Sequence, residues 1–583
     1  MLALALMAVA APSAAGMSTD SRNTDLPNTD THFRASAPGA LAEWESRSRK
    51  LRDQILFAAG LMPFPERTPL NSEVFGRIER PGYTIEKVLL RTLPGYYLGG
   101  NLYRPAGAGP FPAVLKPHGH WSYGRLEQQQ LGSGQSLAAN LARLGFVVFA
   151  YDMVGYNDTY QLPHRFTGNR EALWGFGPFG LQLWNSIRAL DFVASLPDVD
   201  QSRLAVTGAS GGGTQTFFLG AVDDRVALTA PVNMVSAIMQ GGCVCENAPG
   251  LRVGAYNVDF SAMMGPRPQL LVAATGDWTK NVPREEFPDI RRIYQLFGKP
   301  ENIEAAQFDA PHNYHEDSRT AVYRFLARHL LDRGDAASIT EVRVQIEQPR
   351  DLLAFYGRPL PADAVDYPGL FAWWRENARR QSEAVTDPEV ARRLLRLAIK
   401  ASFPARVEAA VDGAEIVLSR DRVGDRVPGR WYRQSEPASL ILHPGGAEAA
   451  CASRAARDRR AAGRSVLCLD LFQTGRATAS RDRSHEHFLT FNLSDDANRI
   501  QDVLTGLAFL ETGGHQDLEL VGLDRAALWG VFAAAIAPRK VRFEADLSPF
   551  TGDDDELLDK CFVPGIQRAG GLAAARRLAV ANR

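Results

Sequence analysis

A serine between glycines is the residue of this chain best suited to act as a nucleophile. Ser210 lies in the sequence Gly-Ala-Ser-Gly-Gly, directly after the β-branched strand-like run 204–207. Residues 215–221 then resemble the start of a helix. A sharp turn from a strand into a helix needs glycines beside the serine, because a Cβ there would clash. The pattern predicts an exposed serine hydroxyl at the carboxyl edge of a sheet, the alternative being a tight turn that carries a serine by chance.

A serine hydroxyl needs a general base, and that base needs a carboxylate to orient it. In the chain order serine, acid, histidine, the acid follows a late strand and the histidine follows the next strand. Asp277 follows the apolar run 270–274, and His312 follows the run 303–308. We therefore predict Asp277 as the acid and His312 as the base, with His315 as the second histidine candidate.

Two backbone N–H groups are needed to stabilise the oxyanion of a tetrahedral intermediate. Gly211 follows the nucleophile and is predicted to supply one of them. The second is predicted to come from His120 or Trp121, in the loop after the short strand 113–115.

Two further side chains are candidates for the pocket. Glu246 follows the strand 228–232 and is either the rival acid or a group that binds substrate or supports the pocket. Trp278 follows the predicted acid and is suited to stack on a sugar ring, although most tryptophans serve as apolar core.

We expect no metal and no cofactor. His118 and His120 form a close pair, but no third ligand stands out in the sequence. The H-x-x-H pair after the last predicted strand lacks the i, i+4 spacing of a metal-binding helix. Cys243 and Cys245 are too close for an easy bridge to each other, and we interpret them as packing residues. The five cysteines fit no disulfide framework.

Strands and helices alternate through the first part of the chain. Such alternation predicts an α/β fold, in which a mostly parallel sheet carries helices on both faces. The predicted strands are two within 83–104, followed by 113–115, 146–152, 204–207, 228–232, 270–274 and 303–308, and the predicted helices are 41–61, 136–144, 180–196 and 320–331.

This pattern returns in the last part of the chain. Residues 439–446 match 113–119, 465–470 match 146–152, 498–511 match the helix 180–196, and 518–526 match the nucleophile strand. Asp152 precedes Ser210 by 58 residues, and Asp470 precedes Asp524 by 54. We predict a duplication. The domains expected are a catalytic domain at 17–335 with an N-terminal helical extension, a linker at 336–386 and a second copy at 387–583.

The second copy lacks the predicted chemistry. Asp524 stands where the first copy has Ser210, and Ala526 replaces the second glycine of the turn. Only 59 residues follow Asp524, and none of them is a histidine. We therefore expect a degenerate domain that supports the structure or shapes the substrate site, the alternative being an unrelated α/β domain.

Composition excludes several classes of partner. The net charge is −1 with Lys and Arg spread along the chain, which argues against nucleic acid or an anionic membrane as the main partner. No interior apolar run has the length of a membrane span. Residues 1–16 are Ala-rich and resemble a signal peptide without a basic start, so we expect a periplasmic or secreted protein unless Met17 is the true start. The oligomeric state is left open.

Five motifs make residues 83–331 resemble the α/β-hydrolase superfamily. They are 118–121, 151–156, 208–212, 245–250 and 309–313. The similarity is greatest to bacterial exported esterases of the acetylxylan-esterase-like and dienelactone-hydrolase-like groups.

This resemblance implies a serine esterase in which Ser210 is the nucleophile, Asp277 the acid and His312 the base. It also implies a small-molecule or carbohydrate ester as substrate, with acetylated plant polysaccharide preferred. One alternative is a peptidase of the prolyl-oligopeptidase type, although no propeller repeats precede the core. The other is a non-catalytic binding protein on a hydrolase scaffold.

Overall fold

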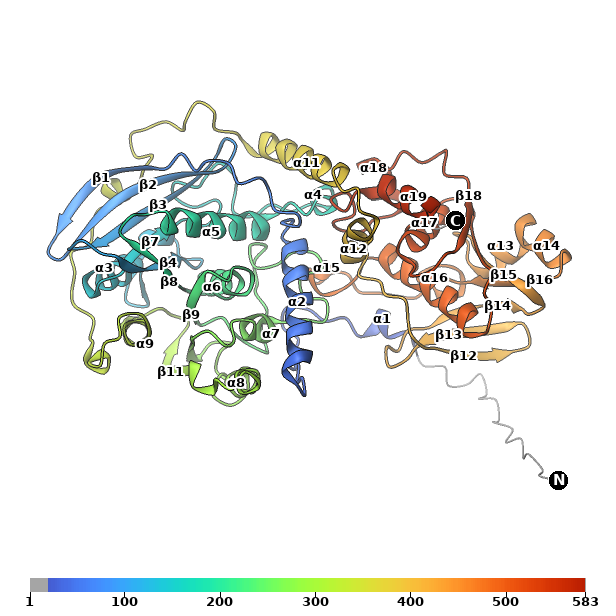
Figure 1. The fold of residues 1–583 in the computed structure, drawn as a ribbon, viewed down its shortest axis with the longest axis horizontal. Helices are drawn as coiled ribbons and strands as arrows, with labels where there is room; N and C mark the ends of the chain where they lie inside the picture. Colours follow the sequence, from blue (N-terminus) through green and yellow to red (C-terminus); the bar gives the residue numbers. More distant parts are fainter. Residues whose placement is uncertain (1–18, 582–583) are drawn as a thin grey trace, which may run out of the picture.

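The computed structural model describes residues 19–581 and contains two large β-sheets that lie at opposite ends of an elongated molecule (Figure 1). We call residues 41–331 the first unit and residues 388–581 the second unit. The signal peptide predicted at residues 1–16 lies outside the described residues. Within the described part of the chain, no helix is both long enough and apolar enough to cross a membrane.

The sheet of the first unit has nine strands. Its spatial order is β1 (Glu73–Arg80), β2 (Tyr83–Leu93), β3 (Tyr96–Pro105), β7 (Val147–Tyr151), β4 (Phe111–Pro117), β8 (Val199–Ala209), β9 (Val226–Val232), β10 (Gln269–Gly276) and β11 (Ile303–Pro311). The pairs from β1 to β7 are antiparallel, and all pairs from β7 to β11 are parallel.

Helices cover both faces of this sheet, as predicted. Side chains that alternate along β7 enter two different apolar cores, because successive residues of a strand point to opposite faces. One core packs under α5 (Pro178–Ala194) and α6 (Gly211–Val222), and the other under α3 (Gly134–Leu144) and α9 (Glu316–Leu330). The α/β fold class is confirmed. Strand β1 was not predicted, because most of its side chains are exposed and its apolar signal is weak.

The sheet of the second unit has seven strands. Their spatial order is β12 (Val407–Asp412), β13 (Glu415–Arg420), β14 (Val427–Tyr432), β16 (Arg464–Leu469), β15 (Ser435–Leu442), β17 (Leu518–Gly522) and β18 (Arg542–Ala545). This order and its strand directions repeat those of β1 through β9 in the first sheet. The second sheet has no counterparts of β10 and β11 among the described residues.

The two units share an apolar core. Helix α2 (Leu41–Ala58) packs against α12 (Pro388–Ile399) between the two sheets (Figure 1). The largest cluster of buried apolar residues runs through both units and includes side chains of both helices. The second unit is therefore docked firmly on the first.

The segment 336–386 differs from the irregular linker that we expected. It contains helix α11 (Tyr367–Glu383), which begins where the Asp366 side chain accepts a hydrogen bond from the amide of Gly369. Trp374 of this helix is buried and donates its indole N–H to the carbonyl of Trp174. Because this segment is rich in Pro and Arg, the sequence analysis did not predict the helix, whose apolar side chains pack on the first unit.

The cysteines also differ from the expectation. Cys451 and Cys468 form a disulfide within the second unit, although the sequence suggested no disulfide framework. Cys451 lies in helix α13 (Ala447–Ala452), and Cys468 lies in strand β16. Only the packing of that helix on the strand brings the two residues together, and their sequence spacing does not reveal it. Cys243, Cys245 and Cys561 are free and buried.

Candidate active site

Ser210 occupies a strained turn between β8 and α6. Its backbone has φ 58° and ψ −124°, a conformation that non-glycine residues adopt rarely and mostly at functional sites. A Cβ on Gly208 would lie 2.5 Å from the carbonyl oxygen of Pro117, and one on Gly212 would lie 2.6 Å from the same atom. The two glycines are therefore required by the close approach of strand β4. This geometry fits a nucleophile elbow.

Asp277 and His312 lie side by side at the ends of neighbouring strands. Gly276 of β10 pairs with Pro311 of β11, so the next residue of each strand reaches the same edge of the sheet. His312 Nδ1 lies 2.8 Å from Asp277 Oδ2. A carboxylate only accepts hydrogen bonds, so Nδ1 carries the proton and Nε2 presents its lone pair. The other oxygen, Oδ1, accepts from the amide of Thr279 at 2.7 Å, which fixes the carboxylate.

The serine and the histidine of the predicted triad are not hydrogen-bonded in this structure. No hydrogen bond joins Ser210 to His312 among the described residues, and His312 Nε2 is a buried nitrogen without a partner. In an enzyme without substrate such bonds are often long and tighten only in the complex. The fold thus brings all three predicted residues to one sheet edge, with the acid and base already paired.

The predicted oxyanion loop runs directly against the nucleophile. A Cβ on Gly119 would lie 2.9 Å from Cβ of Ser210, so His120 and Trp121 follow a point of contact with the serine. Gly211 is the first residue of α6, and its amide has no acceptor within the helix. Both predicted sources of N–H donors therefore lie beside Ser210.

A buried histidine that the sequence analysis did not assign holds this loop. His118 Nε2 accepts a hydrogen bond from the amide of Met153 at 3.0 Å, and Nδ1 lies 2.7 Å from the carbonyl oxygen of Gly119. Burial keeps the pKa of His118 well below its usual range, which suits a neutral ring with one donor and one acceptor. The predicted strand 113–115, which leads into this loop, was the one available signal for this positioning role.

Two indole rings lie beside the His312 ring. The centroid of Trp278 is 4.4 Å from that of His312, and the Trp121 ring stacks at 6.3 Å. Trp278 Nε1 donates to the carbonyl of Asn233, whose own side-chain amide donates to the carbonyl of Asn313. Asn233, which the sequence did not single out, thereby links the loops that carry the acid and the base.

The other candidates are placed elsewhere. Glu246 makes no hydrogen bond with His312; its buried carboxylate accepts from the amide of Cys243 at 3.1 Å and from the Thr214 hydroxyl at 3.3 Å. Glu246 is therefore not the orienting acid in this geometry. His315 caps helix α9, where its ring accepts a hydrogen bond from the amide of Ser318.

The fold also gives His120 neighbours that the sequence did not indicate. His164, Cys243 and Cys245 surround its side chain, and the four ligand atoms all lie within 4.8 Å of one another. The sequence offered no third ligand for His120, because these residues come from loops far apart in the chain.

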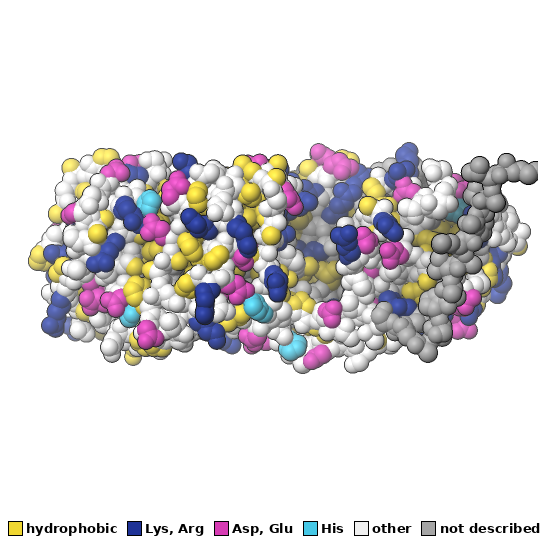
Figure 2. All heavy atoms as spheres, turned by 90° about the horizontal axis from the view of Figure 1, so that it is seen from below, with side chains coloured by type: hydrophobic (Ala, Val, Ile, Leu, Met, Phe, Trp, Pro, Cys, Tyr) yellow, Lys and Arg dark blue, Asp and Glu magenta, His cyan; other side chains and the backbone are white. Residues whose placement is uncertain are grey.

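A cleft of about 650 Å³ lies between the two units. It is lined by residues within 167–180 and 244–249 of the first unit and within 481–499 of the second. Seen from below, the surface is hollowed between the two halves of the molecule, with Lys and Arg side chains around the hollow (Figure 2). Ser210 and His312 do not line this cleft.

Comparison with known proteins shows that the first unit is similar to esterases. Residues 183–235, which include the turn at Ser210, match the acetyl xylan esterase family model. The chain is 30% identical over 170 residues to YtaP of Bacillus subtilis (strain 168), to which hydrolase activity is ascribed by name. That match covers 28% of this chain and 56% of YtaP, so the chain spans about half the length of this curated relative.

A solved structure of the methylesterase BT1017 is also similar. It is 27% identical, with 59% of this chain and 78% of that chain covered and a TM-score of 0.51. Together with the strand order, these similarities show that the first unit has the α/β-hydrolase fold and is related to esterases.

Proposed function

We propose that this protein is a serine carboxylesterase that acts through an acyl-enzyme. The observation that carries the proposal is the hydrogen bond between Asp277 and His312, formed at the same sheet edge as the strained Ser210. The similarity of the first unit to acetyl xylan esterases and to a methylesterase supports ester substrates over amide substrates.

The proposed reaction has two half-reactions. His312 Nε2 takes the proton of the Ser210 hydroxyl as its oxygen attacks the ester carbonyl, and the ring then gives that proton to the departing alcohol. Asp277 holds the ring and stabilises its positive charge. The amides of Gly211 and of the 120–121 loop stabilise the oxyanion. A water molecule, deprotonated by His312, then releases the acid and restores Ser210.

We propose a carbohydrate ester, with a small acyl or alkyl group, as the substrate class. The indoles of Trp121 and Trp278 beside His312 supply flat apolar faces on which a sugar ring can stack. The cleft between the units offers room for parts of a long substrate beyond the ester. The second unit has Asp524 where the first unit has Ser210, and we propose that it is non-catalytic.

We further propose that the protein works in the periplasm or outside the cell. The Cys451–Cys468 disulfide supports this location, because such bonds persist in oxidising compartments. The predicted signal peptide points the same way.

A labelling experiment combined with an ester panel tests the proposal. A fluorophosphonate probe should modify Ser210, identified by peptide mass spectrometry, and acetyl, butyryl, feruloyl and methyl-glucuronate esters should be hydrolysed with different kcat/KM. Ser210→Ala should lose both labelling and activity. Full activity of Ser210→Ala on p-nitrophenyl acetate would refute the serine mechanism. Cleavage of prolyl amides without ester hydrolysis would support a peptidase instead.

A further inference from the structure

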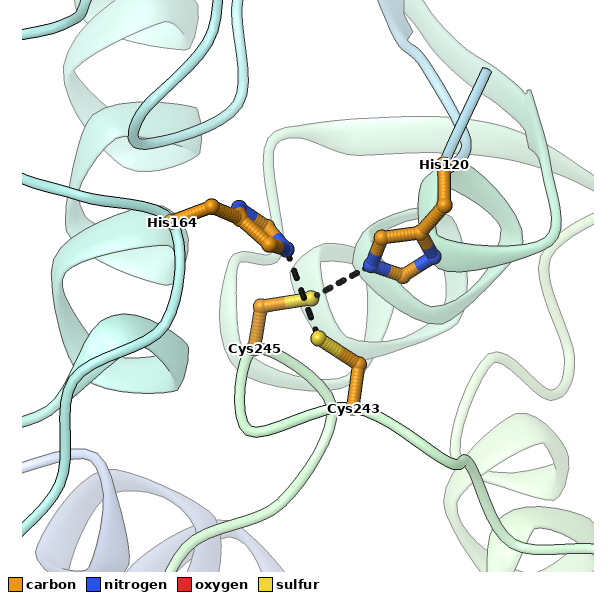
Figure 3. A group of neighbouring side chains, drawn as sticks. All are labelled: His120, His164, Cys243 and Cys245. Carbon is orange, nitrogen blue, oxygen red and sulfur yellow. Dashed lines mark hydrogen bonds between the residues drawn. The ribbon is translucent and has the colours of Figure 1, made fainter. Parts of the chain in front are cut away.

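Four side chains beside the candidate active site form a cluster with the chemistry of a metal site. His120, His164, Cys243 and Cys245, here called the His2Cys2 cluster, come from three separate loops and point toward one another (Figure 3). His120 Nε2 lies 3.1 Å from the sulfur of Cys245, and His164 Nε2 lies 3.3 Å from the sulfur of Cys243. Both cysteines are buried.

These distances suit tetrahedral coordination. Zn–S bonds of about 2.3 Å and Zn–N bonds of about 2.0 Å place nitrogen and sulfur ligands roughly 3.5 Å apart around one ion. The observed nitrogen-to-sulfur contacts are slightly shorter, and the widest separation within the cluster is under 4.8 Å. The four ligand atoms thus lie close enough together to surround a single ion.

The surroundings prepare one imidazole for coordination. His164 Nδ1 lies 2.6 Å from the carbonyl oxygen of Val154, which only accepts hydrogen bonds. Nδ1 therefore carries the proton, and Nε2 presents a lone pair toward Cys243. Metal-bound histidines almost always donate their other ring N–H to such an acceptor. The amide of Cys243 is likewise fixed, because it donates to Glu246.

We propose that the His2Cys2 cluster binds one Zn²⁺ ion as a structural site. Two imidazole nitrogens and two thiolates form a donor set and geometry typical of zinc, and four protein ligands leave no open position for catalysis. Each thiol releases its proton to solvent on binding, so the two thiolates balance the charge of the ion.

The position of the cluster indicates what the ion holds. Residues 233–256, which carry both cysteines, contain no helix or strand. The sulfurs pack in a small apolar cluster of their own with Met153, separate from the large cores. An ion would join this loop to the loop of His164 and to the predicted oxyanion loop, where a Cβ on Gly211 would lie 2.9 Å from the His120 ring. Only this positioning effect rests on the proposed function; metal binding does not.

Metal analysis of the full chain tests the site without any activity assay. Protein made in zinc-supplemented medium should contain about one zinc per chain by inductively coupled plasma mass spectrometry. Cys243→Ser and His164→Ala should lose most of that zinc. Cys561→Ala is the matched control, because it removes a buried free thiol outside the cluster and should keep the metal.

Cobalt replacement gives a readout that does not depend on a variant that folds poorly. Wild-type protein stripped of metal, reduced and loaded with Co²⁺ should show thiolate-to-cobalt charge-transfer absorption and the visible bands of a tetrahedral ion. Wild-type protein that holds well under one zinc per chain and gives no such absorption would overturn the proposal. So would a Cys243–Cys245 disulfide in the metal-free wild type, or zinc that remains in the Cys243→Ser variant. If wild-type protein binds zinc but hydrolyses no ester, that result would count against the proposed function alone and not against the metal site.

Discussion

The edge of the first sheet at Ser210 and the edge of the second sheet at Asp524 are built on the same plan. Ser210 follows strand β8, which lies parallel between β4 and β9. Asp524 follows strand β17, which lies parallel between β15 and β18. The backbone of Asp524 keeps a positive φ of 51°, close to the 58° of Ser210. The two turns therefore share a backbone feature, although only the first carries a serine.

The two sheets differ in what surrounds that turn. The first sheet continues into β10 and β11, whose ends carry Asp277 and His312. The second sheet stops at β18, and the chain then forms helices α18 (Asp554–Lys560) and α19 (Gly571–Ala581). Among the described residues, the second sheet therefore has no strand ends equivalent to those that position Asp277 and His312 in the first.

The second unit instead contacts the loops of the first. The amide of Gly250 donates to the carbonyl of Leu489 at 2.7 Å, and that of Arg252 donates to the carbonyl of Thr490 at 2.9 Å. Both donors follow closely on the loop of Cys243 and Cys245. The second unit thus contacts the irregular segment that continues from the loop of Cys243 and Cys245.

Exchange of the two turn residues is expected to have the largest effect. Ser210→Ala should reduce kcat by at least about 10⁴-fold, because the nucleophile is lost. Adding Asp524→Ser to that variant should restore nothing, because among the described residues the second sheet has no counterparts of the two strands that carry Asp277 and His312. Ester hydrolysis and fluorophosphonate labelling of both variants check this. Recovery of labelling at residue 524 would show that the second unit contains groups able to activate a serine at this turn.

Removal of the orienting carboxylate comes next. Asp277→Asn should lower kcat by about 10⁴-fold, since an amide favours the wrong tautomer of His312. Glu246→Gln is the matched control, because it alters a buried carboxylate that does not contact the histidine. Steady-state kinetics of both variants decide between the two acids. A larger loss in the Glu246 variant would reverse their assignment.

The second glycine of the turn is expected to matter at an intermediate level. Gly212→Ala, which copies Ala526 of the second unit, places a methyl group 2.6 Å from the carbonyl oxygen of Pro117. We expect a loss of roughly 1–3 kcal/mol in unfolding free energy from overpacking, with kcat reduced up to about 10²-fold as the serine shifts. Urea denaturation and kinetics measure these effects. Gly334→Ala, with open space around its Cβ, should change neither.

The disulfide of the second unit should affect activity least. Replacing Cys451 and Cys468 by alanine should lower the unfolding free energy of the second unit by about 3 kcal/mol, since the closed loop spans 17 residues. We expect kcat to change less than about twofold, because the bond lies far in sequence and structure from the Ser210 edge. Calorimetry and kinetics of the double variant check both. A large drop in kcat would mean that the second unit acts on catalysis directly.

The local patterns of the sequence were enough to predict much of the fold. Glycines beside Ser210 and apolar runs before Asp277 and His312 predicted strands along the chain and a candidate triad. These features depend on near neighbours in the chain, where turn sterics and side-chain periodicity act. Helix α11 escaped prediction because its polar composition concealed an apolar face that only packing on the first unit reveals.

Contacts between distant segments were decided by the tertiary structure alone. It rejected Glu246 as the orienting acid, joined Cys451 to Cys468, and gave His118 its place behind the oxyanion loop. It also gathered the His2Cys2 cluster from three loops. The sequence by itself determined which residues can do chemistry and which strands carry them. Only the folded chain decided which side chains meet, because loops at one sheet edge are neighbours in space whatever their separation in sequence.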